Sequence, residues 1–205
     1  MRVCALGKTE RLSISTKDPD ELSYPPNGFA GMTRRTGKKP IIAACNGHAH
    51  GGGFEIVLNS DIVLASPNAN FRLPDVMRGT AAISGGLARL CRNFTLQRAM
   101  WLVLTAHTLT AEQALEWGLV QKIVPIENLL EETIKVAKVV ASMSPDSVIA
   151  SRAGVRQGWE SSSVEHATYL TIESYGRKLF SGDNLREGLA AFMEKREPKW
   201  TPSKL

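Results

Sequence analysis

The chain has 205 residues, of which 43% are hydrophobic and 22% are charged, and its formal net charge at pH 7 is +5. This composition indicates one globular domain, or one such domain with an appendage. No apolar run approaches the roughly 18–20 residues that span a bilayer, and no positively charged start precedes an apolar segment, so neither a membrane span nor a secretory signal is predicted.

Charge and cysteine content narrow the class of protein further. A pI of about 9.2 suits either a nucleic acid or a ligand that carries several phosphates. No recognised nucleic-acid-binding motif is present, so we expect no nucleic-acid partner. The three cysteines, Cys4, Cys45 and Cys91, are an odd number without the spacing of a metal site. We therefore predict reduced thiols in an intracellular protein.

The first 36 residues are polar and contain Pro25-Pro26 and Gly28. This composition predicts mostly irregular structure, with at most one short helical stretch. The pattern of regular elements begins after them, with the apolar run Ile41–Cys45. That run ends at the turn pair Asn46-Gly47, which is typical of a buried strand. The next predicted elements are, in chain order, a short apolar helix after the glycines at 51–53 and strands at 61–65 and 70–73.

The glycines at 51–53 allow a ligand to approach the backbone where the short helix begins. The first N–H groups of a helix lack intrahelical partners and carry partial positive charge, so they suit an oxygen that develops negative charge. Glu55 lies three residues after Gly52 and projects from the same side of the first turn. An N–H donor and a carboxylate would then face one ligand. The alternative is a tight turn followed by a first-turn acid that the helix dipole favours.

After residue 75 the pattern is mainly helical. One or two helices are predicted between residues 87 and 104, and Thr110 has the character of a helix-capping residue. Residues 129–143 have the spacing of an amphipathic helix, and Ser144-Pro145 opens another. We place a domain boundary near Pro145, between an α/β core (residues 1–144) and a C-terminal helical region (residues 145–205).

Several of these segments together resemble the crotonase superfamily, the enoyl-CoA hydratase/isomerase family. The main segment is NGHAHGGGFEIVLNSDIVLASPNANFRLPDVMRG, which begins at Asn46. The resemblance continues through LARL and LTAHTLTAEQALEWGLVQKIVP and into EGLAAFMEKREPKW. Each piece is weak alone, but their order and spacing are specific. Together they cover most of the chain from about Gly37.

The resemblance implies an α/β core built as a spiral of ββα units, followed by helices that assemble a trimer or a hexamer (a dimer of trimers). Family members begin with several strands before the equivalent of Lys39, and this chain has no room for them. We therefore expect the N-terminal strands to be missing and the strand near Ile41 to have unpaired edges. Those strands bear part of the family's coenzyme A site. This leaves open a second hypothesis, a non-catalytic truncated paralogue that acts as an assembly or CoA-binding subunit.

The resemblance also implies roles for individual residues. Glu55 matches the family's first catalytic glutamate, and Asp75 takes the position of the second, where Glu is usual. Two such acids serve water addition to an enoyl thioester, because one accepts a proton from water as it attacks C3 and the other helps to position it while C2 is protonated. The thioester oxygen would be held by the N–H groups of Gly52 and, from the first loop, of Lys8. The alternative for Asp75 is a turn residue after Pro74.

Other residues are expected to contact the substrate, which the resemblance implies is a coenzyme A thioester. They are Gly51, Gly53, His50, Phe192 and Lys195. The last two match family positions that touch the coenzyme, and their alternative is an ordinary amphipathic helix. His48 and His50 lie on one side of an extended segment, which suits a metal, but no third ligand is evident. We therefore predict no metal and no covalently bound cofactor.

The chain ends in Ser203-Lys204-Leu205, and a C-terminal S-K-L is read by the peroxisomal import receptor. The preceding residues, 200–202, are polar and contain a proline, so we predict an exposed tail that leaves the tripeptide accessible. Together these features predict a peroxisomal enoyl-CoA hydratase (a lyase) or isomerase of fatty-acid or secondary metabolism. The presence of two acids favours hydration over a shift of the double bond.

Overall fold

The computed structural model describes residues 2–6 and 26–205. Within these ranges, no helix is both long and apolar enough to cross a membrane. The described residues divide into two compact units. The core unit comprises residues 2–6, 26–37 and 41–134, and the C-terminal unit comprises residues 38–40 and 135–205. The core unit contains helices and sheets and the C-terminal unit is helical, so the predicted α/β class is confirmed. The domain boundary near Pro145 stays a prediction.

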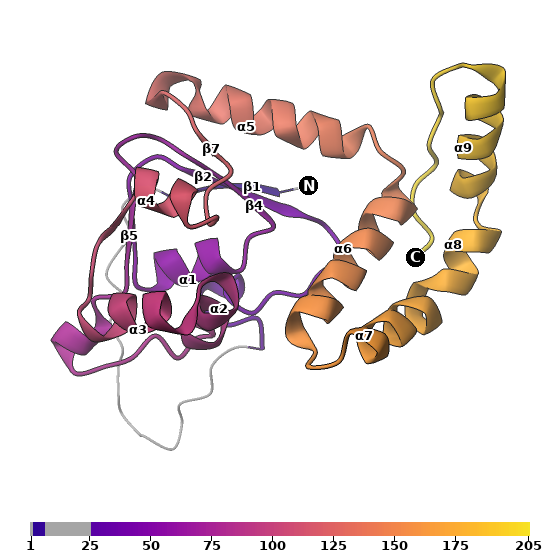
Figure 1. Cartoon of the computed structure of the whole chain (residues 1–205). Coiled ribbons are helices and arrows are strands. Elements are labelled where there is room, and N and C mark those ends of the chain that lie inside the picture. The colour runs from indigo at the N-terminus through magenta and orange to yellow at the C-terminus, as the bar shows by residue number, and fades with distance from the viewer. Residues whose placement is uncertain (1, 7–25) are drawn as a thin grey trace. The chain divides into compact units, whose positions relative to one another are not determined.

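The main sheet of the core unit contains four parallel strands in the order β1-β2-β4-β7 (Figure 1). These strands are β1 (Arg2–Leu6), β2 (Ile41–Cys45), β4 (Ile62–Ala65) and β7 (Lys122–Ile123). All five residues of β2 are buried, as expected for a strand that is covered on both faces. The apolar runs that predicted strands at 41–45 and 61–65 therefore predicted them correctly.

The strand β1 corrects two expectations for the N-terminal part of the chain. Residues 2–6 are a strand, where mostly irregular structure was predicted. This strand pairs with β2 along its whole length, while β4 pairs with the other side of β2. The expectation of unpaired edges near Ile41 is therefore wrong. The physical reason is that the N–H and C=O groups of a buried strand need partners, and a five-residue strand is long enough to supply them on one side.

A second, smaller sheet determines where the two predicted acids lie. Its strands, in the order β3-β5-β6, are β3 (His48–His50), β5 (Asn70–Arg72) and β6 (Leu109–Thr110). β3 and β5 are parallel, with Ala49 paired with Phe71, and both of these central residues are buried. The helix α1 (Gly52–Leu58) follows β3, and the 3-10 helix η3 (Asp75–Arg78) follows β5. Because the strands are parallel, both segments leave the sheet at the same edge.

The helix α1 is buried along almost its whole length and packs mainly against β3 and α2 (Gly86–Asn93). The core unit also contains α3 (Leu96–Leu104), which contacts α2; α4 (Ala111–Glu116), which contacts β6 and β7; and the 3-10 turn η2 (Phe29–Gly31). Phe54 of α1 packs against Phe71 of β5, with ring centroids 5.6 Å apart. Thr110 caps α4 in a capping box with Gln113, which confirms the predicted helix start. The helix α5 (Ile126–Ala141) continues from the core unit into the C-terminal unit.

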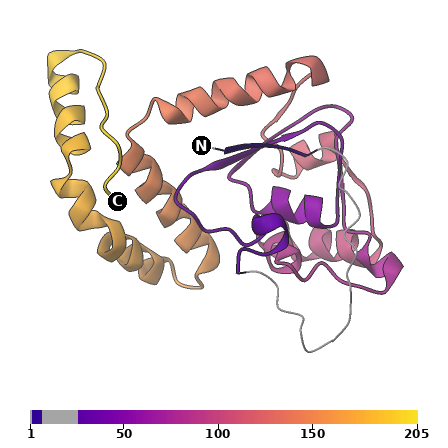
Figure 2. The same ribbon diagram turned by 180° about the vertical axis from the view of Figure 1, so that it is seen from behind.

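Helices follow one another through the C-terminal unit (Figures 1 and 2). They are α6 (Pro145–Glu160), α7 (Val164–Thr171), the π-helical turn η4 (Ile172–Gly176), α8 (Arg177–Ser181) and α9 (Asp183–Glu194). Ser144 caps α6 and Pro145 occupies its first turn, so the predicted helix start at this point is confirmed. After α9 the chain runs back as an extended tail (Figures 1 and 2).

This tail packs on the C-terminal unit, where an accessible tail was predicted. Asp146 on α6 and Asn184 on α9 are buried, and the Asn184 Nδ2 donates a hydrogen bond of 2.7 Å to the Asp146 carboxylate. The N–H of Thr201 donates to Asn184 Oδ1 at 2.9 Å, and the Ser203 hydroxyl donates to Asp146. The physical reason for the difference is that buried polar groups need partners, and the tail supplies them.

The last two residues of the chain are held at the same surface. The Lys204 ammonium lies 2.6 Å from the Asp183 carboxylate, and its hydrogen bond and charge hold the pKa of Asp183 below its usual value. The Lys38 ammonium donates a hydrogen bond to the terminal Leu205. Ser203 and Leu205 are half-buried, and only the Lys204 side chain is exposed within this tripeptide.

Candidate active site

The two predicted acids lie at the same edge of the smaller sheet. Glu55 is in the first turn of α1 and is 4% exposed, and Asp75 is the first residue of η3. Burial raises the pKa of Glu55, and the nearby Asp75 carboxylate raises it as well. Burial also raises the pKa of Asp75. The structure therefore brings together two carboxyl groups that both hold a proton more tightly than a solvent-exposed acid.

The Glu55 carboxylate is held by a backbone group at the start of α2. The N–H of Gly86 donates a hydrogen bond of 2.8 Å to Glu55 Oε1, and this bond lowers the pKa of the carboxyl against the effect of burial. A Cβ at Gly86 would lie 2.6 Å from Glu55 Cγ, so only glycine permits this approach. Sequence reasoning missed Gly86, and the available signal was a Gly-Gly pair at the start of a predicted helix.

Asp75 has an oxygen without a partner in the part of the chain that the structure describes. Its Oδ2 atom is buried and accepts no hydrogen bond from a described residue. The backbone of Asp75 does form a turn, since its carbonyl accepts a hydrogen bond from Thr80. A turn alone does not require a buried carboxylate oxygen, so the side chain remains available to a ligand or to water.

The glycines that precede Glu55 lie where β3 leads into α1, and the helix begins at Gly52 rather than after Gly53 as predicted. The N–H of Gly51 donates to Arg72 at 2.9 Å, and its carbonyl accepts from the N–H of Glu55 at 3.0 Å. Gly52 is the first residue of α1 and Gly53 is buried in its first turn. The N–H groups of Gly52 and Gly53 have no intrahelical acceptor. Lys8, predicted to supply the second oxyanion donor, lies outside the described residues.

The two histidines of β3 are joined through a residue of β5. Asn70 Oδ1 lies 3.0 Å from His48 Nδ1 and 2.7 Å from His50 Nε2. Within the described residues, no group of three or more histidine, cysteine, aspartate or glutamate side chains could hold a metal ion. The role of His50 in the acyl site stays a prediction.

Phe192 and Lys195, predicted to contact the coenzyme, belong to the C-terminal unit. Phe192 lies on α9 and is 84% exposed, and Lys195 caps the C-terminal end of the same helix. Glu55 and Asp75 belong to the core unit. The contact of Phe192 and Lys195 with the coenzyme therefore stays a prediction.

Comparison with known proteins shows what the chain as a whole is similar to. Residues 20–203 match the family model described as enoyl-CoA hydratase/isomerase. The chain is 47% identical over 186 residues to mevalonyl-coenzyme A hydratase of Aspergillus fumigatus, an alignment that covers 91% of this chain and 68% of that protein. It is 41% identical over 190 residues to mevalonyl-coenzyme A hydratase of Beauveria bassiana, with coverage of 92% and 67%.

Solved structures show the same likeness. The enoyl-CoA hydratase from Mycobacterium tuberculosis H37Rv superposes with a TM-score of 0.79 at 33% sequence identity, covering 84% of this chain and 68% of that one. This likeness confirms the predicted crotonase-type fold. The chain spans about two thirds of the length of the relatives it matches.

The raised pKa of Glu55 predicts that the contribution of this residue to the free energy of unfolding depends on pH. A folded-state pKa above the usual value of 4.5 means that the proton on Glu55 stabilises the fold fully below about pH 4.5, and that this contribution is lost as the pH rises through the folded-state pKa. Glu55→Gln keeps an oxygen that accepts from Gly86 and carries no charge. We expect its free energy of unfolding, relative to the natural chain, to grow as the pH rises from 4.5 to 8.

Denaturant titrations of both proteins at several pH values would measure this difference. Glu116→Gln, at an exposed position of α4, is the matched control and should show no such trend. A difference between Glu55→Gln and the natural chain that stays constant with pH would contradict the prediction.

Proposed function

This chain belongs to the enoyl-CoA hydratase/isomerase family, whose members act on acyl-CoA thioesters, and from that premise we propose that it catalyses the reversible addition of water across the C2–C3 double bond of an enoyl-CoA. The observation that carries this proposal is that the buried Glu55 and the half-buried Asp75 lie near one another at one edge of the smaller sheet. An isomerase that moves a double bond needs one base, whereas hydration uses both acids.

The proposed chemistry follows from the environment of the two carboxyl groups. Burial and mutual repulsion favour a state in which the pair shares one proton, so one group is a base while the other is an acid. The base accepts a proton from water as the water oxygen bonds to C3. The electron pair of the double bond moves onto the thioester oxygen as an enolate. When the enolate collapses, C2 takes a proton from the group that acts as the acid, so the pair again holds one proton. The N–H of Gly52 would stabilise the oxygen of this enolate.

The hydrogen bond from Gly86 to Glu55 serves this chemistry because it fixes the orientation of one carboxylate. Its Oε1 accepts from the Gly86 N–H, and a carboxylate has further lone pairs that can accept a hydrogen bond from water. The partner oxygen, Oδ2 of Asp75, lacks a hydrogen bond from any described residue. A substrate water between the two groups would satisfy both.

The finer proposal concerns the acyl group. The two mevalonyl-coenzyme A hydratases among the relatives support a branched, 3-methyl-substituted acyl group over a straight fatty-acyl chain. Asp75 is one methylene shorter than the glutamate that is usual in the family, so its carboxylate stands further from C3. The extra room suits a C3 that carries a methyl group. This substrate class belongs to secondary metabolism, which we favour over fatty-acid oxidation.

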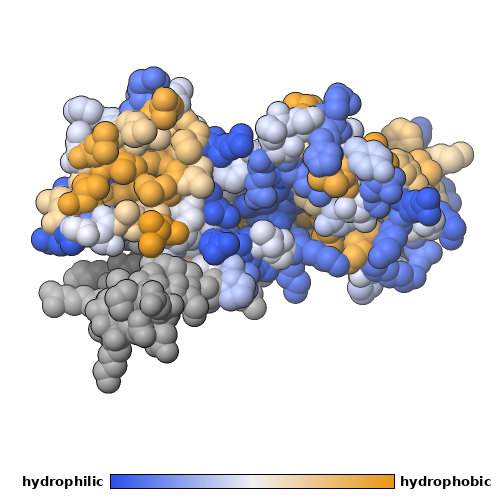
Figure 3. Space-filling view, turned by 90° about the horizontal axis from the view of Figure 1, so that it is seen from below, coloured by the Kyte–Doolittle hydropathy of each residue, from blue (hydrophilic) through white to orange (hydrophobic). Residues whose placement is uncertain are grey.

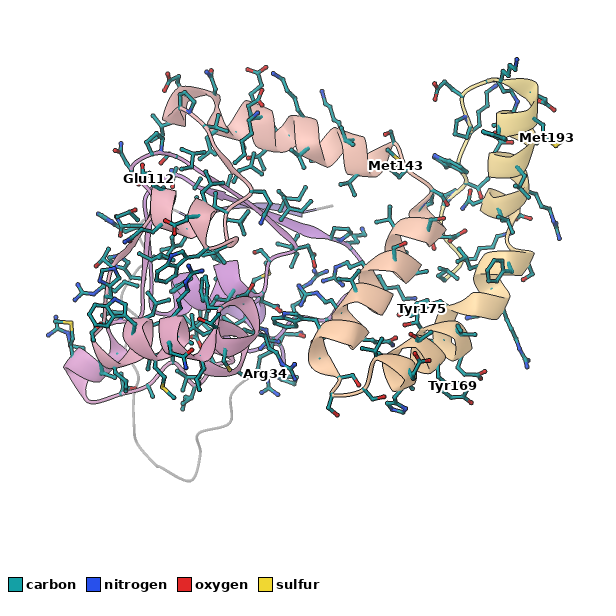
Figure 4. The ribbon with its side chains drawn as sticks, viewed as in Figure 1. Arg34, Glu112, Met143, Tyr169, Tyr175 and Met193 are labelled. Atoms are coloured by element: carbon teal, nitrogen blue, oxygen red, sulfur yellow. The ribbon has the colours of Figure 1, made fainter. Side chains whose placement is uncertain are left out.

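We further propose that the chain assembles as a trimer or a hexamer. Large apolar side chains are exposed on α7, α8 and α9, among them Tyr169 at 60%, Phe180 at 74% and Met193 at 82%. Tyr169 and Met193 project from their helices in Figure 4. Figure 3 shows a broad apolar area on the core unit as well. Exposed apolar surfaces of this kind favour contact with further copies of the chain.

The S-K-L terminus supports a proposal that the protein enters peroxisomes. The import receptor reads the free terminal carboxylate and the side chains of the tripeptide. Since Ser203 bonds to Asp146 and Lys204 pairs with Asp183, the tail must leave this surface before the receptor engages it. Binding of the tail to this surface therefore competes with its binding to the import receptor.

Replacement of either acid tests the proposed reaction. We expect Glu55→Gln and Asp75→Asn each to lower kcat by ~100-fold or more, because general acid–base catalysis contributes on that scale. Loss of the absorbance of a conjugated enoyl thioester measures hydration, and migration of the double bond measures isomerisation. A 3-methyl-substituted enoyl-CoA and a straight-chain enoyl-CoA should be compared as substrates.

Two outcomes would contradict these assignments. Unchanged turnover in both variants would show that these acids do not carry the reaction. Absence of turnover on every enoyl-CoA, with acyl-CoA binding retained in calorimetry, would instead support the non-catalytic paralogue.

The assembly has a direct test. Light scattering at micromolar concentration should give the mass of three or six chains, each of 22.4 kDa. A mass of one chain would overturn the proposed assembly, and with it a coenzyme contact by Lys195 that depends on a neighbouring copy.

Localisation is tested with a reporter fused at the N-terminus. We expect it in peroxisomes, and in the cytosol after deletion of residues 203–205. Asn184→Ala removes the hydrogen bonds to Thr201 and Asp146 and should increase the imported fraction, whereas Asn68→Ala, at an exposed position of the core unit, should not. An equal distribution with and without the tripeptide would show that S-K-L is not read in this protein.

A further inference from the structure

The guanidinium of Arg89, on α2, holds the peptide group whose N–H contacts Glu55. Its Nη1 donates to the carbonyl of Gly85 at 3.2 Å, and the N–H of Gly86 donates to Glu55 Oε1 at 2.8 Å. That carbonyl and that N–H are the two ends of one peptide unit. We propose that Arg89 is a positioning residue for Glu55, which fixes and polarises the Gly85–Gly86 peptide that orients the carboxylate.

The peptide unit transmits the effect of Arg89 because it is planar. In a trans peptide the C=O and N–H bonds point in opposite directions, so a donor fixed on the Gly85 oxygen fixes the direction of the Gly86 N–H. A cation on the carbonyl also draws electron density from the N–H and strengthens it as a donor, as in other chains of hydrogen bonds. Arg89 thus acts on the carboxylate without touching the substrate.

A second contact holds the guanidinium in place. Arg89 Nε donates to Asn59 Oδ1 at 2.9 Å. Asn59 caps the C-terminal end of α1 and is 1% exposed. Its Nδ2 donates to the carbonyls of Met32 and Arg35, at 2.7 and 3.1 Å. These bonds fix the amide group whose oxygen accepts from Arg89. The arginine therefore connects the end of α1 to the turn that begins α2.

The turn that precedes α2 leaves space for the guanidinium of Arg89. Gly85 has φ of 116°, a conformation that residues with a side chain rarely adopt. A Cβ at this position would lie 2.5 Å from Arg89 Nη1. Gly85 therefore admits the guanidinium on one side of the peptide, and Gly86 admits the carboxylate on the other.

The positive charge of Arg89 affects Glu55 as well, in addition to the hydrogen bonds that fix the peptide. Two charged groups influence Glu55 within the described part of the chain: Asp75 from η3 raises the pKa of Glu55 and Arg89 from α2 lowers it. The uncharged donors are the backbone groups of Gly86 and Ser84, which also lower it. Arg89 therefore opposes the burial that would keep Glu55 protonated, and it favours the ionised form that accepts a proton from water.

The consequence for turnover rests on the proposed function, whereas the effect on Glu55 itself does not. Two variants separate charge from geometry. Arg89→Met removes both, and Arg89→Lys keeps a cation but loses the fork that reaches Asn59 and Gly85 together. Arg92→Met, at an exposed position of the same helix, is the matched control.

Two measurements on these variants test the proposal. Carbon-13 NMR titration of the Glu55 carboxyl should show a higher pKa in Arg89→Met. In kinetics, Arg89→Met should lower kcat by ~10- to 100-fold with KM little changed, because a displaced catalytic group costs rate on this scale. The acidic limb of its pH–rate profile should move to higher pH. Arg89→Lys should return that limb toward its position in the natural chain while kcat stays low.

The proposal fails if folded Arg89→Met titrates at Glu55 like the natural chain and the Arg92→Met control. If Arg89→Met does not fold, Arg89→Lys decides, and natural kcat in that variant would overturn the role of the guanidinium. If the natural chain turns over no enoyl-CoA, the proposed function fails, and the titration alone decides the role of Arg89.

Discussion

The hydrogen bond from the Gly86 N–H to the Glu55 carboxylate is the interaction on which the arrangement of the core unit depends. A carboxylate that is 4% exposed is costly unless donors replace its water. Here the donor comes from the backbone, at the start of α2, and the two glycines of that turn leave space for it. The position of α2 against α1 is therefore determined by a polar contact as well as by apolar packing.

The smaller sheet explains why two acids separated by twenty positions in the chain lie together. β3 and β5 are parallel neighbours, so the segments that follow them leave at one edge. One acid follows each strand. Their proximity raises the pKa of Glu55 and adds to the effect of burial. Such an arrangement destabilises a fold at neutral pH, and shifts of this kind are frequent at enzyme active sites.

The C-terminal unit depends on a similar buried polar group. Asp146 and Asn184 bond to one another and then to the tail through Thr201 and Ser203. The same two side chains hold the tail and join α6 to α9. A segment with the composition of a free terminus is thus part of the packed unit, and its last residues have partners on the protein surface.

The sequence by itself determined the local elements and the family, and it supplied the candidate site. Apolar runs and turn residues are local signals, so they located the strand at 41–45, the helix after the glycines, and the caps at Thr110 and Ser144. The order and spacing of the segments from Asn46 onward resembled the enoyl-CoA hydratase/isomerase family, and the comparisons confirm that the chain belongs to it. Only the tertiary structure decided which distant groups are partners. Four contacts join segments that are far apart in the chain. They are the pairing of residues 2–6 with β2, the hydrogen bond of Gly86 to Glu55, the hydrogen bond of Arg89 to Asn59, and the contact of the tail with Asp146. Hydrogen-bond partners of buried groups are chosen by geometry in three dimensions, and no local pattern of residues specifies them.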